Sequence, residues 1–286
     1  MDNVIVFAAA LYGALIGSFL NVCIFRLPRR CLRIWKPKLS FCPACHASLG
    51  WKELLPLASY LLLAGRCRSC RVQIPVRYFL VELATTLFFV GIAERHLVGV
   101  EERAWVQAAI ELLLGCSLLV CALTDWDHMI IPDEIDIPGF LVAPFLVAAA
   151  PALISEPPAW ASEPHLRAAL ASAFGAAIGG GVIFLVGWGG TKIFKKDAIS
   201  LGDVKLLAMI GGFTGWQGAV ASLVTGAMTG AAYGVVRRLT VGDHVLPFGP
   251  FLALGAALYA FVPPFRAYTL DMLEATVRAL GMISGK

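Results

Sequence analysis

The chain has 286 residues, of which 59% are hydrophobic and only 15% are charged. With a mean hydropathy of +0.78, this composition excludes an ordinary soluble globular domain. The net charge of +4 bears on membrane topology rather than on nucleic acid, so we expect the lipid bilayer as a partner and no nucleic acid.

Apolar segments that could cross a bilayer recur along the chain, since a spanning helix needs roughly 20 residues. We predict an all-α, polytopic integral membrane protein with about eight transmembrane helices. The eight predicted segments lie near Val4–Cys23, Tyr78–Ala93, Trp105–Thr124, Pro138–Ile154, Leu166–Gly189, Val204–Thr214, Ala219–Val236 and Pro247–Val262. The sixth of them is short for a transmembrane span.

The basic residues predict the orientation of these helices. Segment 26–77 holds eleven of the 23 Lys and Arg residues and a single acid, Glu53, and the loops at 192–196 and 237–238 are basic too. With eight spans, all three segments fall on one side, which the positive-inside rule makes cytoplasmic. Because no basic residue precedes the first span, we expect residues 1–25 to be a retained anchor with its amino terminus outside, not a cleaved signal peptide.

Two CxxC pairs lie in the basic segment, in the pattern C-x2-C-x21-C-x2-C. Four thiolates in two close pairs are what a tetrahedral Zn²⁺ site requires, and a cytoplasmic position disfavours disulfides. Because all four positions are cysteine, no coordination position stays open, and we expect the zinc to be structural. The alternative is a redox role or a chance occurrence of the pairs. The predicted ligands are Cys42, Cys45, Cys67 and Cys70.

Two aspartates lie where apolar segments meet polar ones. Asp125 ends the third predicted span, and Asp203 follows Gly202 at the start of the sixth. A carboxylate costs about 2.5–3.5 kcal/mol at the centre of a membrane helix, so acids near spans indicate function. Two carboxyls can share one proton, one then acting as general base and the other as general acid. The pattern indicates an aspartic protease, although Asp203 could instead only cap its helix.

Further acids follow Asp125 in the same connection. A metal site is one interpretation of this loop, but for each acid we expect a solvated position, because ionised side chains are seldom buried without a partner. His128 alone is weak support for a metal ligand or a base. The acids are Asp127, Asp133, Glu134 and Asp136.

Several blocks, in order along nearly the whole chain, resemble the bacterial prepilin peptidases, or type IV leader peptidases. Ser200 departs from the pattern, because it stands where the family's GxGD motif has its first glycine. The blocks are residues 17–22 (GSFLNV) with 26–28 (RLP), the two CxxC pairs, Asp125 with Pro132-Asp133, residues 200–205 (SLGDVK), and residues 246–255 (LPFGPFLALG).

The resemblance implies that Asp125 and Asp203 are the catalytic pair of an intramembrane aspartyl endopeptidase and that the four cysteines bind zinc. It implies type IV prepilins and type II secretion pseudopilins with amino-terminal leaders as substrates. It also implies methylation of the new amino terminus from S-adenosyl-L-methionine, for which only residues 17–22 and the adjoining basic loop are candidates. The location would be the bacterial inner membrane, with the zinc loop and the aspartates toward the cytoplasm. Nothing indicates the oligomeric state.

These predictions divide the chain into four parts: a first transmembrane helix (1–25), a cytoplasmic zinc-binding region with the four cysteines (26–77), a transmembrane peptidase core (78–262) and an interfacial tail (263–286). Two other functions stay open. A GxGD protease of the presenilin or signal-peptide-peptidase kind would lack the cysteine tetrad. A secondary transporter could use the two aspartates as a proton relay, but the zinc loop and the lack of an inverted repeat disfavour it.

Overall fold

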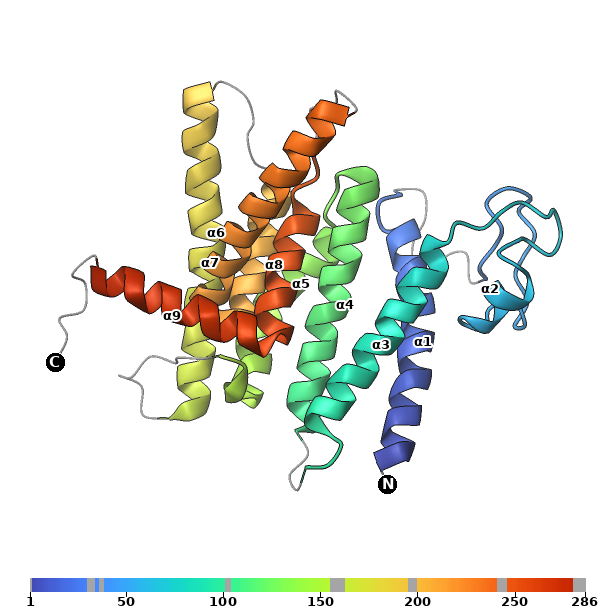
Figure 1. The fold of residues 1–286 in the computed structure, drawn as a ribbon, viewed down its shortest axis with the longest axis horizontal. Coiled ribbons are helices and arrows are strands. Elements are labelled where there is room, and N and C mark those ends of the chain that lie inside the picture. Colours follow the sequence, from blue (N-terminus) through green and yellow to red (C-terminus); the bar gives the residue numbers. More distant parts are fainter. Residues whose placement is uncertain are drawn as a thin grey trace. The chain divides into compact units, whose positions relative to one another are not determined.

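The computed structural model describes residues 2–29, 34–35, 39–100, 104–154, 163–194, 200–240 and 246–279. Parts of the predicted basic segments and of the tail (30–33, 36–38, 195–199 and 280–286) lie outside these ranges. The regular elements of the described part are helices, joined by turns and loops, and its only β-structure is two isolated bridges, which confirms the all-α prediction (Figure 1). The helices are α1 (Asp2–Arg26), α2 (Ala58–Leu62), α3 (Arg77–His96), α4 (Trp105–His128), α5 (Asp133–Ala149), η1 (Pro151–Leu153), α6 (Pro164–Phe194), α7 (Leu201–Thr240), α8 (Gly249–Phe261) and α9 (Pro263–Ala279).

The predicted count of eight spans is not confirmed. Among the described residues, four helices are long and apolar enough to cross a membrane: α1, α4, α6 and α7. Helices α8 and α9 meet at 99° and would add a fifth span if they form one broken helix. Helix α5 has only 17 residues, and α3 carries charged residues near both ends and at Glu82. Length and hydropathy therefore support a multi-pass membrane protein with four or five candidate spans.

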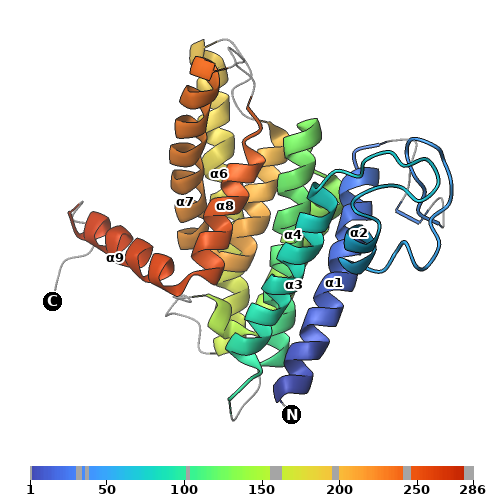
Figure 2. The ribbon, with the colours of Figure 1, turned by 45° about the vertical axis from the view of Figure 1, so that its right-hand side comes forward.

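Helix α7 reverses direction at Gly215. This residue has φ 75° and ψ 176°, a conformation that glycine adopts without a Cβ clash. Asp203 interacts electrostatically with Asp125, whereas the ring of Tyr233 lies 5.6 Å from that of Trp126. Residues 203 and 233 would be about 45 Å apart in a straight helix. Because both lie at the carboxyl end of α4, the two halves of α7 run antiparallel (Figures 1 and 2).

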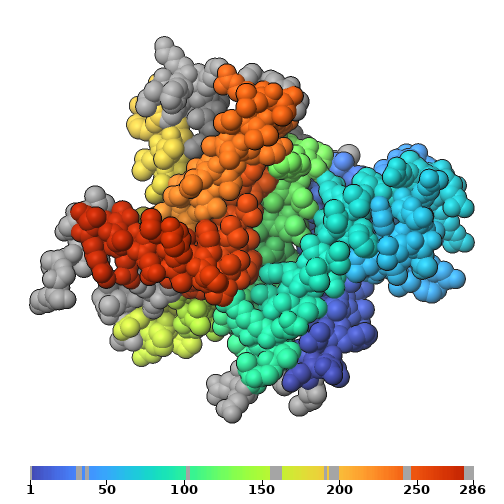
Figure 3. All heavy atoms as spheres, in the orientation of Figure 1, coloured from blue at the N-terminus to red at the C-terminus, as the bar shows by residue number. Residues whose placement is uncertain are grey.

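The chain forms two compact units, Met1–Cys116 and Ser117–Lys286. In the first unit α1 packs along α3, and residues 39–76 form a lobe beside them (Figures 2 and 3). A Cβ added at Gly17 would lie 2.8 Å from the Cα of Glu82, so the two backbones approach closely there. The side-chain amide of Asn21 donates to the carbonyl of Tyr78 at 3.0 Å. Gly17 and Asn21 therefore lie in the contact surface of α1 with α3.

In the second unit α6, α7 and α8 pack around a core that includes Leu206, Ile210 and Leu252. A Cβ added at Gly175 of α6 would lie 2.2 Å from the carbonyl oxygen of Gly211 in α7. Small residues allow such close approach, on which helix association in lipid depends. Helix α9 leaves this bundle at the sharp bend after α8 and buries none of its residues (Figure 3).

Candidate active site and cysteine cluster

Asp125 is buried near the carboxyl end of α4 and is held by the start of α8. Its Oδ2 accepts a 2.9 Å hydrogen bond from the backbone N–H of Gly249, the first residue of α8. The first N–H groups of a helix have no partner within it, and this end of the helix favours negative charge. A Cβ at position 249 would lie 2.8 Å from the same Oδ2. Glycine therefore lets the helix start meet the carboxylate directly.

Asp203 is buried in the first turn of α7. Its Oδ2 accepts a 3.2 Å hydrogen bond from the N–H of Ser200, and the Ser200 hydroxyl accepts one of 3.1 Å from the N–H of Gly202. This reciprocal pattern resembles a capping box, with Ser200 at the N-cap and the acid three residues later. The capping role considered for Asp203 is therefore real, and it uses only one of its two carboxylate oxygens.

The structure brings Asp125 and Asp203 together from different helices of the second unit. Their carboxylates are close enough to interact electrostatically. Ile131 contacts the backbone next to both aspartates. A Cβ added at Gly202 would lie 3.3 Å from the Ile131 Cβ, and one added at Gly249 would lie 3.1 Å from the Ile131 Cδ1. Each carboxylate has one oxygen fixed by a backbone N–H, and no other side-chain hydrogen bond to either is formed within the described residues.

A third carboxyl belongs to this group. Asp136 has no exposed surface, so the prediction of a solvated position is wrong for this residue. The thiol of Cys121 donates to its Oδ1 at 3.4 Å, and its Oδ2 has no hydrogen-bond partner among the described residues. Asp136 also interacts electrostatically with Asp203 and Lys205. Asp136 is buried because α5 begins at Asp133, and the helical repeat turns the side chain at position 136 into the bundle.

The other acids of the connection lie at the surface, as predicted: Asp127, Asp133 and Glu134 are exposed. Asp133 forms an ion pair with Lys205, which joins the first turn of α5 to the first turn of α7. An exposed pair of this kind contributes at most about 1 kcal/mol to stability, so its main effect is on local geometry.

Aromatic side chains lie beside Asp125. The rings of Trp126, Tyr233 and Phe251 contact one another, with centroids 5.6 to 6.4 Å apart. They come from α4, the second half of α7 and α8, so the cluster fixes these three helices around the carboxylate. Two buried carboxyls held in this way can divide the roles of proton donor and proton acceptor.

The two CxxC pairs form turns with the same backbone pattern. The N–H of Cys42 donates to the carbonyl of Ala47, and the N–H of Cys67 donates to that of Val72, each at 2.9 Å. The fourth residue after each of these cysteines, His46 and Arg71, has a positive φ of 57° and 61°. One β-bridge flanks each turn, Phe41 with Ser48 and Arg66 with Gln73. The repeated geometry directs both thiols of each pair to one side.

The four thiols meet at one point, as the spacing predicted. One sulfur atom from each of Cys42, Cys45, Cys67 and Cys70 lies within 4.8 Å of all the others, and the Cys42 and Cys70 sulfurs are 3.9 Å apart. Sulfurs around tetrahedral zinc are about 3.8 Å apart when Zn–S is about 2.3 Å. The donor set and its size therefore fit Zn²⁺.

The acidity of these thiols also suits a cation. Hydrogen bonds from the N–H groups of Cys70 and Ser69 lower the pKa of Cys67 to about 7. Although the Val72 N–H stabilises the Cys70 thiolate, burial and the neighbouring thiols raise the pKa of Cys70 to about 11. The Cys67 thiolate therefore forms readily, whereas a positive ion would offset the burial and the neighbouring thiols that oppose ionisation of Cys70.

Two residues of the acidic group escaped the sequence prediction. Gly249 contributes a backbone N–H from residues 246–255, a segment noted only for its resemblance to the family. Asp136 was grouped with the acids expected to be solvated. For Asp136, the only sequence feature that indicated burial was its helical spacing from Pro132.

Comparisons with known proteins divide the chain in nearly the same way as its two compact units. Residues 11–96 match the bacterial peptidase A24 N-terminal domain, and residues 112–235 match the type IV leader peptidase family. The relatives that carry the name prepilin leader peptidase/N-methyltransferase include the following three. That of Pseudomonas aeruginosa is 36% identical over 87% of each chain, and that of Burkholderia pseudomallei is 33% identical over 90% of this chain and 85% of its own. That of Myxococcus xanthus is 37% identical over 80% of this chain, which spans 62% of the relative's length. No solved structure matches the chain.

Proposed function

Because the chain belongs to the type IV leader peptidase family, we propose that it is a membrane-embedded aspartyl endopeptidase. Its substrates are type IV prepilins and type II secretion pseudopilins, whose amino-terminal leader it removes. The observation that carries this proposal is the convergence of Asp125 and Asp203, two buried carboxylates from α4 and α7, each with one oxygen fixed by a backbone N–H.

In the proposed reaction the ionised member of the pair removes a proton from a water molecule, which attacks the scissile carbonyl. The protonated member first donates a hydrogen bond to the carbonyl oxygen and then supplies the proton for the leaving amine. The backbone N–H groups of Ser200 and Gly249 hold both carboxylates in place during this exchange.

The remaining polar groups support this geometry. Asp136 lies next to the pair without exposure to solvent, and the Lys205–Asp133 ion pair ties the start of α7 to the start of α5. A buried carboxyl with an unpartnered oxygen is costly unless it serves a function. We assign Asp136 a positioning role toward Asp203.

Zinc is held by Cys42, Cys45, Cys67 and Cys70 in this proposal. Because four thiolates would fill a tetrahedral Zn²⁺ site, the ion would have no open position for substrate. It stabilises the fold of the lobe at residues 39–76, which has only short elements of its own. The ion takes no part in peptide hydrolysis.

The second proposed activity is methylation of the amino terminus that cleavage exposes, with S-adenosyl-L-methionine as methyl donor. It is supported by the names of the relatives, which join peptidase to N-methyltransferase. We place the protein in the bacterial inner membrane, with the cysteine lobe and the acidic pair toward the cytoplasm. The concentration of Lys and Arg in residues 26–77 supports this orientation.

A proton-coupled transporter would use the same two aspartates differently. Purified protein in lipid vesicles, given a prepilin peptide that spans the leader and the first mature residues, separates the two. The protease yields two fragments whose masses locate a single cut at the leader junction. Proton-coupled uptake with the peptide intact would support the transporter and overturn the proposal.

A further inference from the structure

The lobe at residues 39–76 exposes several large apolar side chains. In α2, Leu61 is 65% exposed and Leu62 is 82% exposed, and Trp51 of the same lobe is 71% exposed. Further exposed apolar side chains of the lobe are Leu39, Leu54, Leu55, Val72 and Val76. So much apolar surface on one small lobe indicates contact with another protein or with a membrane.

Helix α2 lies beside α1 well before the carboxyl end of that helix. The N–H of Leu57, directly before α2, donates to the Oε2 of Glu82 at 2.7 Å, and a Cβ added at Gly17 would lie 2.8 Å from the Cα of Glu82. Glu82 therefore links the start of α2 to the level of Gly17 in α1. Nine residues of α1 follow Gly17, so this level is about 13 Å before the helix end at Arg26. In Figures 1 and 2 the lobe lies alongside this part of α1.

The distance from the end of α1 can be compared with the thickness of a bilayer. Helix α1 is one of the candidate spans, and its sequence is predominantly apolar from Val4 to Phe25. The headgroup layer on each side of the hydrocarbon core is roughly 5–8 Å thick, which is less than about 13 Å. With Arg26 in the headgroup layer, the start of α2 is level with acyl chains. Interfacial amphipathic helices bury their apolar face to a similar depth, about 5–10 Å.

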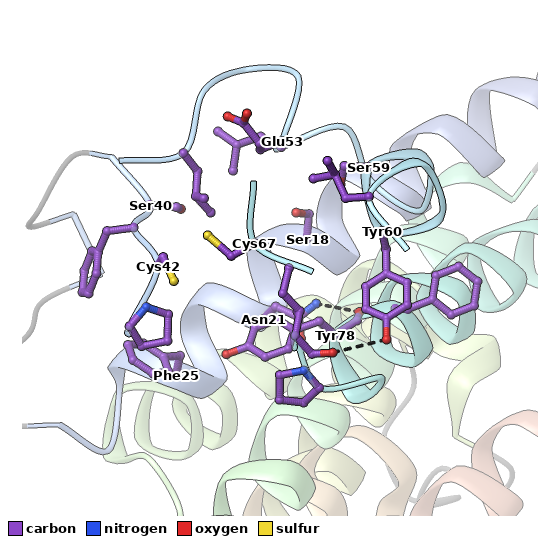
Figure 4. A pocket seen from close by; sticks show the side chains of 18 of the residues that line it. Ser18, Asn21, Phe25, Ser40, Cys42, Glu53, Ser59, Tyr60, Cys67 and Tyr78 are labelled. Atoms are coloured by element: carbon purple, nitrogen blue, oxygen red, sulfur yellow. Dashed lines mark hydrogen bonds between the residues drawn. The ribbon is translucent and has the colours of Figure 1, made fainter. Parts of the chain in front are cut away.

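The two sides of α2 have different surroundings. Tyr60 lines a pocket that the lobe forms with α1 and α3, as Figure 4 shows. Its ring lies 5.4 Å from that of Phe79 in α3, and its hydroxyl donates to the carbonyl of Ile74 at 3.3 Å. Leu61 and Leu62, which follow it, are exposed. Helix α2 therefore packs against α3 through one side and leaves apolar side chains uncovered on the other.

The backbone around α2 has the hydrogen bonds that contact with lipid requires. Acyl chains offer no partner to a backbone N–H, so each group must find one within the protein. The Leu57 N–H, at the start of the helix, has the carboxylate of Glu82. Five further N–H groups donate to carbonyl oxygens of residues 55–61, namely those of Ser59, Leu61, Leu63, Ala64 and Gly65. Glu82 also gains a donor at a depth where an unpartnered carboxylate is costly.

The charges of the lobe suit an anionic membrane surface. Its one acid, Glu53, is paired with Arg68 at 3.0 Å, and three further basic side chains are exposed: Lys52, Arg66 and Arg71. The Nζ of Lys52 lies 5.5 Å from the ring centroid of Trp51. Tryptophan is enriched at the level of the headgroups, and basic side chains near the surface are attracted to anionic lipid.

We propose that the lobe lies partly in the cytoplasmic leaflet of the membrane, with Leu61 and Leu62 of α2 among the acyl chains, Trp51 at the headgroups and the basic side chains against anionic lipid. The inference goes beyond both proposed activities and rests only on the proposed membrane placement of α1. It means that phospholipid, rather than a second copy or the substrate, covers the exposed side of α2. The cysteine cluster is then held at the membrane surface.

A photoreactive side chain tests which molecule covers α2. In zinc-loaded, full-length protein in nanodiscs with anionic phospholipid, p-benzoylphenylalanine replaces Leu62 in one variant and Ser48 in the control. Ser48 is also exposed, but it pairs with Phe41, whose ring contacts Phe25 in the last turn of α1. After irradiation, we expect at least about fivefold more phospholipid adduct at position 62 than at position 48, because only position 62 reaches the acyl chains. Zinc content establishes that the lobe of each variant is folded.

The masses of the adducts distinguish the possible occupants. Equal lipid adducts at both positions, or none at position 62, would overturn the proposal. Adducts of position 62 mainly with a second copy of the chain, or with added prepilin, would overturn it as well.

Wild-type protein provides a second measurement. A phospholipid with a diazirine in its acyl chain is irradiated in the same nanodiscs, and trypsin then releases residues 53–66, which contain α2, and residues 39–52 of the same lobe as the comparison. More label in 53–66 than in 39–52 supports the proposal, and label absent from 53–66 contradicts it. Leader cleavage is recorded on the same preparations. Cleavage without label in 53–66 would refute this inference alone, whereas label there without cleavage would refute only the proposed peptidase.

Discussion

The backbone N–H of Gly249 donates a hydrogen bond to the carboxylate of Asp125, which joins two residues 124 positions apart. This bond places a helix start against one member of the acidic pair. It explains why the block at residues 246–255 matters to a site whose acids lie elsewhere. The same relationship makes position 249 a sensitive test of the geometry.

Gly249→Ala should lower kcat/KM for leader cleavage about tenfold or more, equivalent to at least about 1.4 kcal/mol of transition-state stabilisation. The added Cβ would lie 2.8 Å from the Asp125 Oδ2, so the carboxylate or the helix has to shift. Gly234→Ala is the control, because its Cβ would meet only the Leu246 side chain at 3.8 Å. Steady-state cleavage of a prepilin peptide measures both, and equal rates would contradict the assigned geometry.

Ser200→Gly should leave cleavage near the wild-type rate. Glycine at an N-cap costs only a few tenths of a kcal/mol of helix stability. The backbone N–H at position 200, which donates a hydrogen bond to the Asp203 carboxylate, is kept. Ser200→Val should lower helix stability by about 1 kcal/mol, because it removes the hydroxyl that caps the Gly202 N–H. Thermal unfolding and cleavage assays compare the two. A larger loss in Ser200→Gly than in Ser200→Val would contradict the capping role.

Asp136→Val should raise the melting temperature while it slows leader cleavage several-fold. The native carboxyl is fully buried and leaves one oxygen without a partner among the described residues, a cost of about 1–3 kcal/mol that an apolar side chain removes. The exposed Asp127 is the comparison, and Asp127→Asn should change neither quantity. If Asp136→Val cleaves as fast as wild type, Asp136 has no role beside the pair.

Cys42→Ser should lower zinc affinity and local order together, because the closed site loses one of four thiolates. Wild-type protein should contain about one zinc per chain by mass spectrometry of the metal. Cys116→Ser, outside the cluster, should retain the metal. Carefully purified wild type without zinc would contradict the site, and leader cleavage should fall only as a secondary effect of the disordered lobe.

The sequence alone identified those site residues that stand in a recognisable pattern with their neighbours along the chain. Four cysteines in two close pairs predicted the cluster that the structure forms, and Asp125 and Asp203 were marked by their position at the ends of apolar segments. Their positions suggested that the two acids act as a pair, and the resemblance to a family favoured that role of Asp203 over a helix cap. Their proximity in the structure agrees with that pairing.

The features that the sequence did not predict depend on contacts between distant segments. Gly249 acts through a backbone N–H, which every residue except proline has, so no side chain marks it. Asp136 was misplaced because its neighbours are exposed acids and only the register of α5 turns it inward. The count of eight spans was not confirmed because α5 has only 17 residues and α3 carries charged residues, whereas the break predicted between residues 214 and 219 coincides with the turn of α7 at Gly215.

The central claim is that Asp125 and Asp203 together hydrolyse the leader peptide. Cleavage of a purified prepilin by wild type, Asp125→Asn, Asp203→Asn and the control Asp127→Asn tests it most directly, with circular dichroism to establish that each variant is folded. Asparagine keeps the size and one acceptor oxygen but cannot exchange the proton, so each of the first two variants should lose about 10²-fold or more in rate. The control should cleave like wild type. Retention of about a tenth of wild-type turnover by Asp125→Asn or Asp203→Asn would contradict the account.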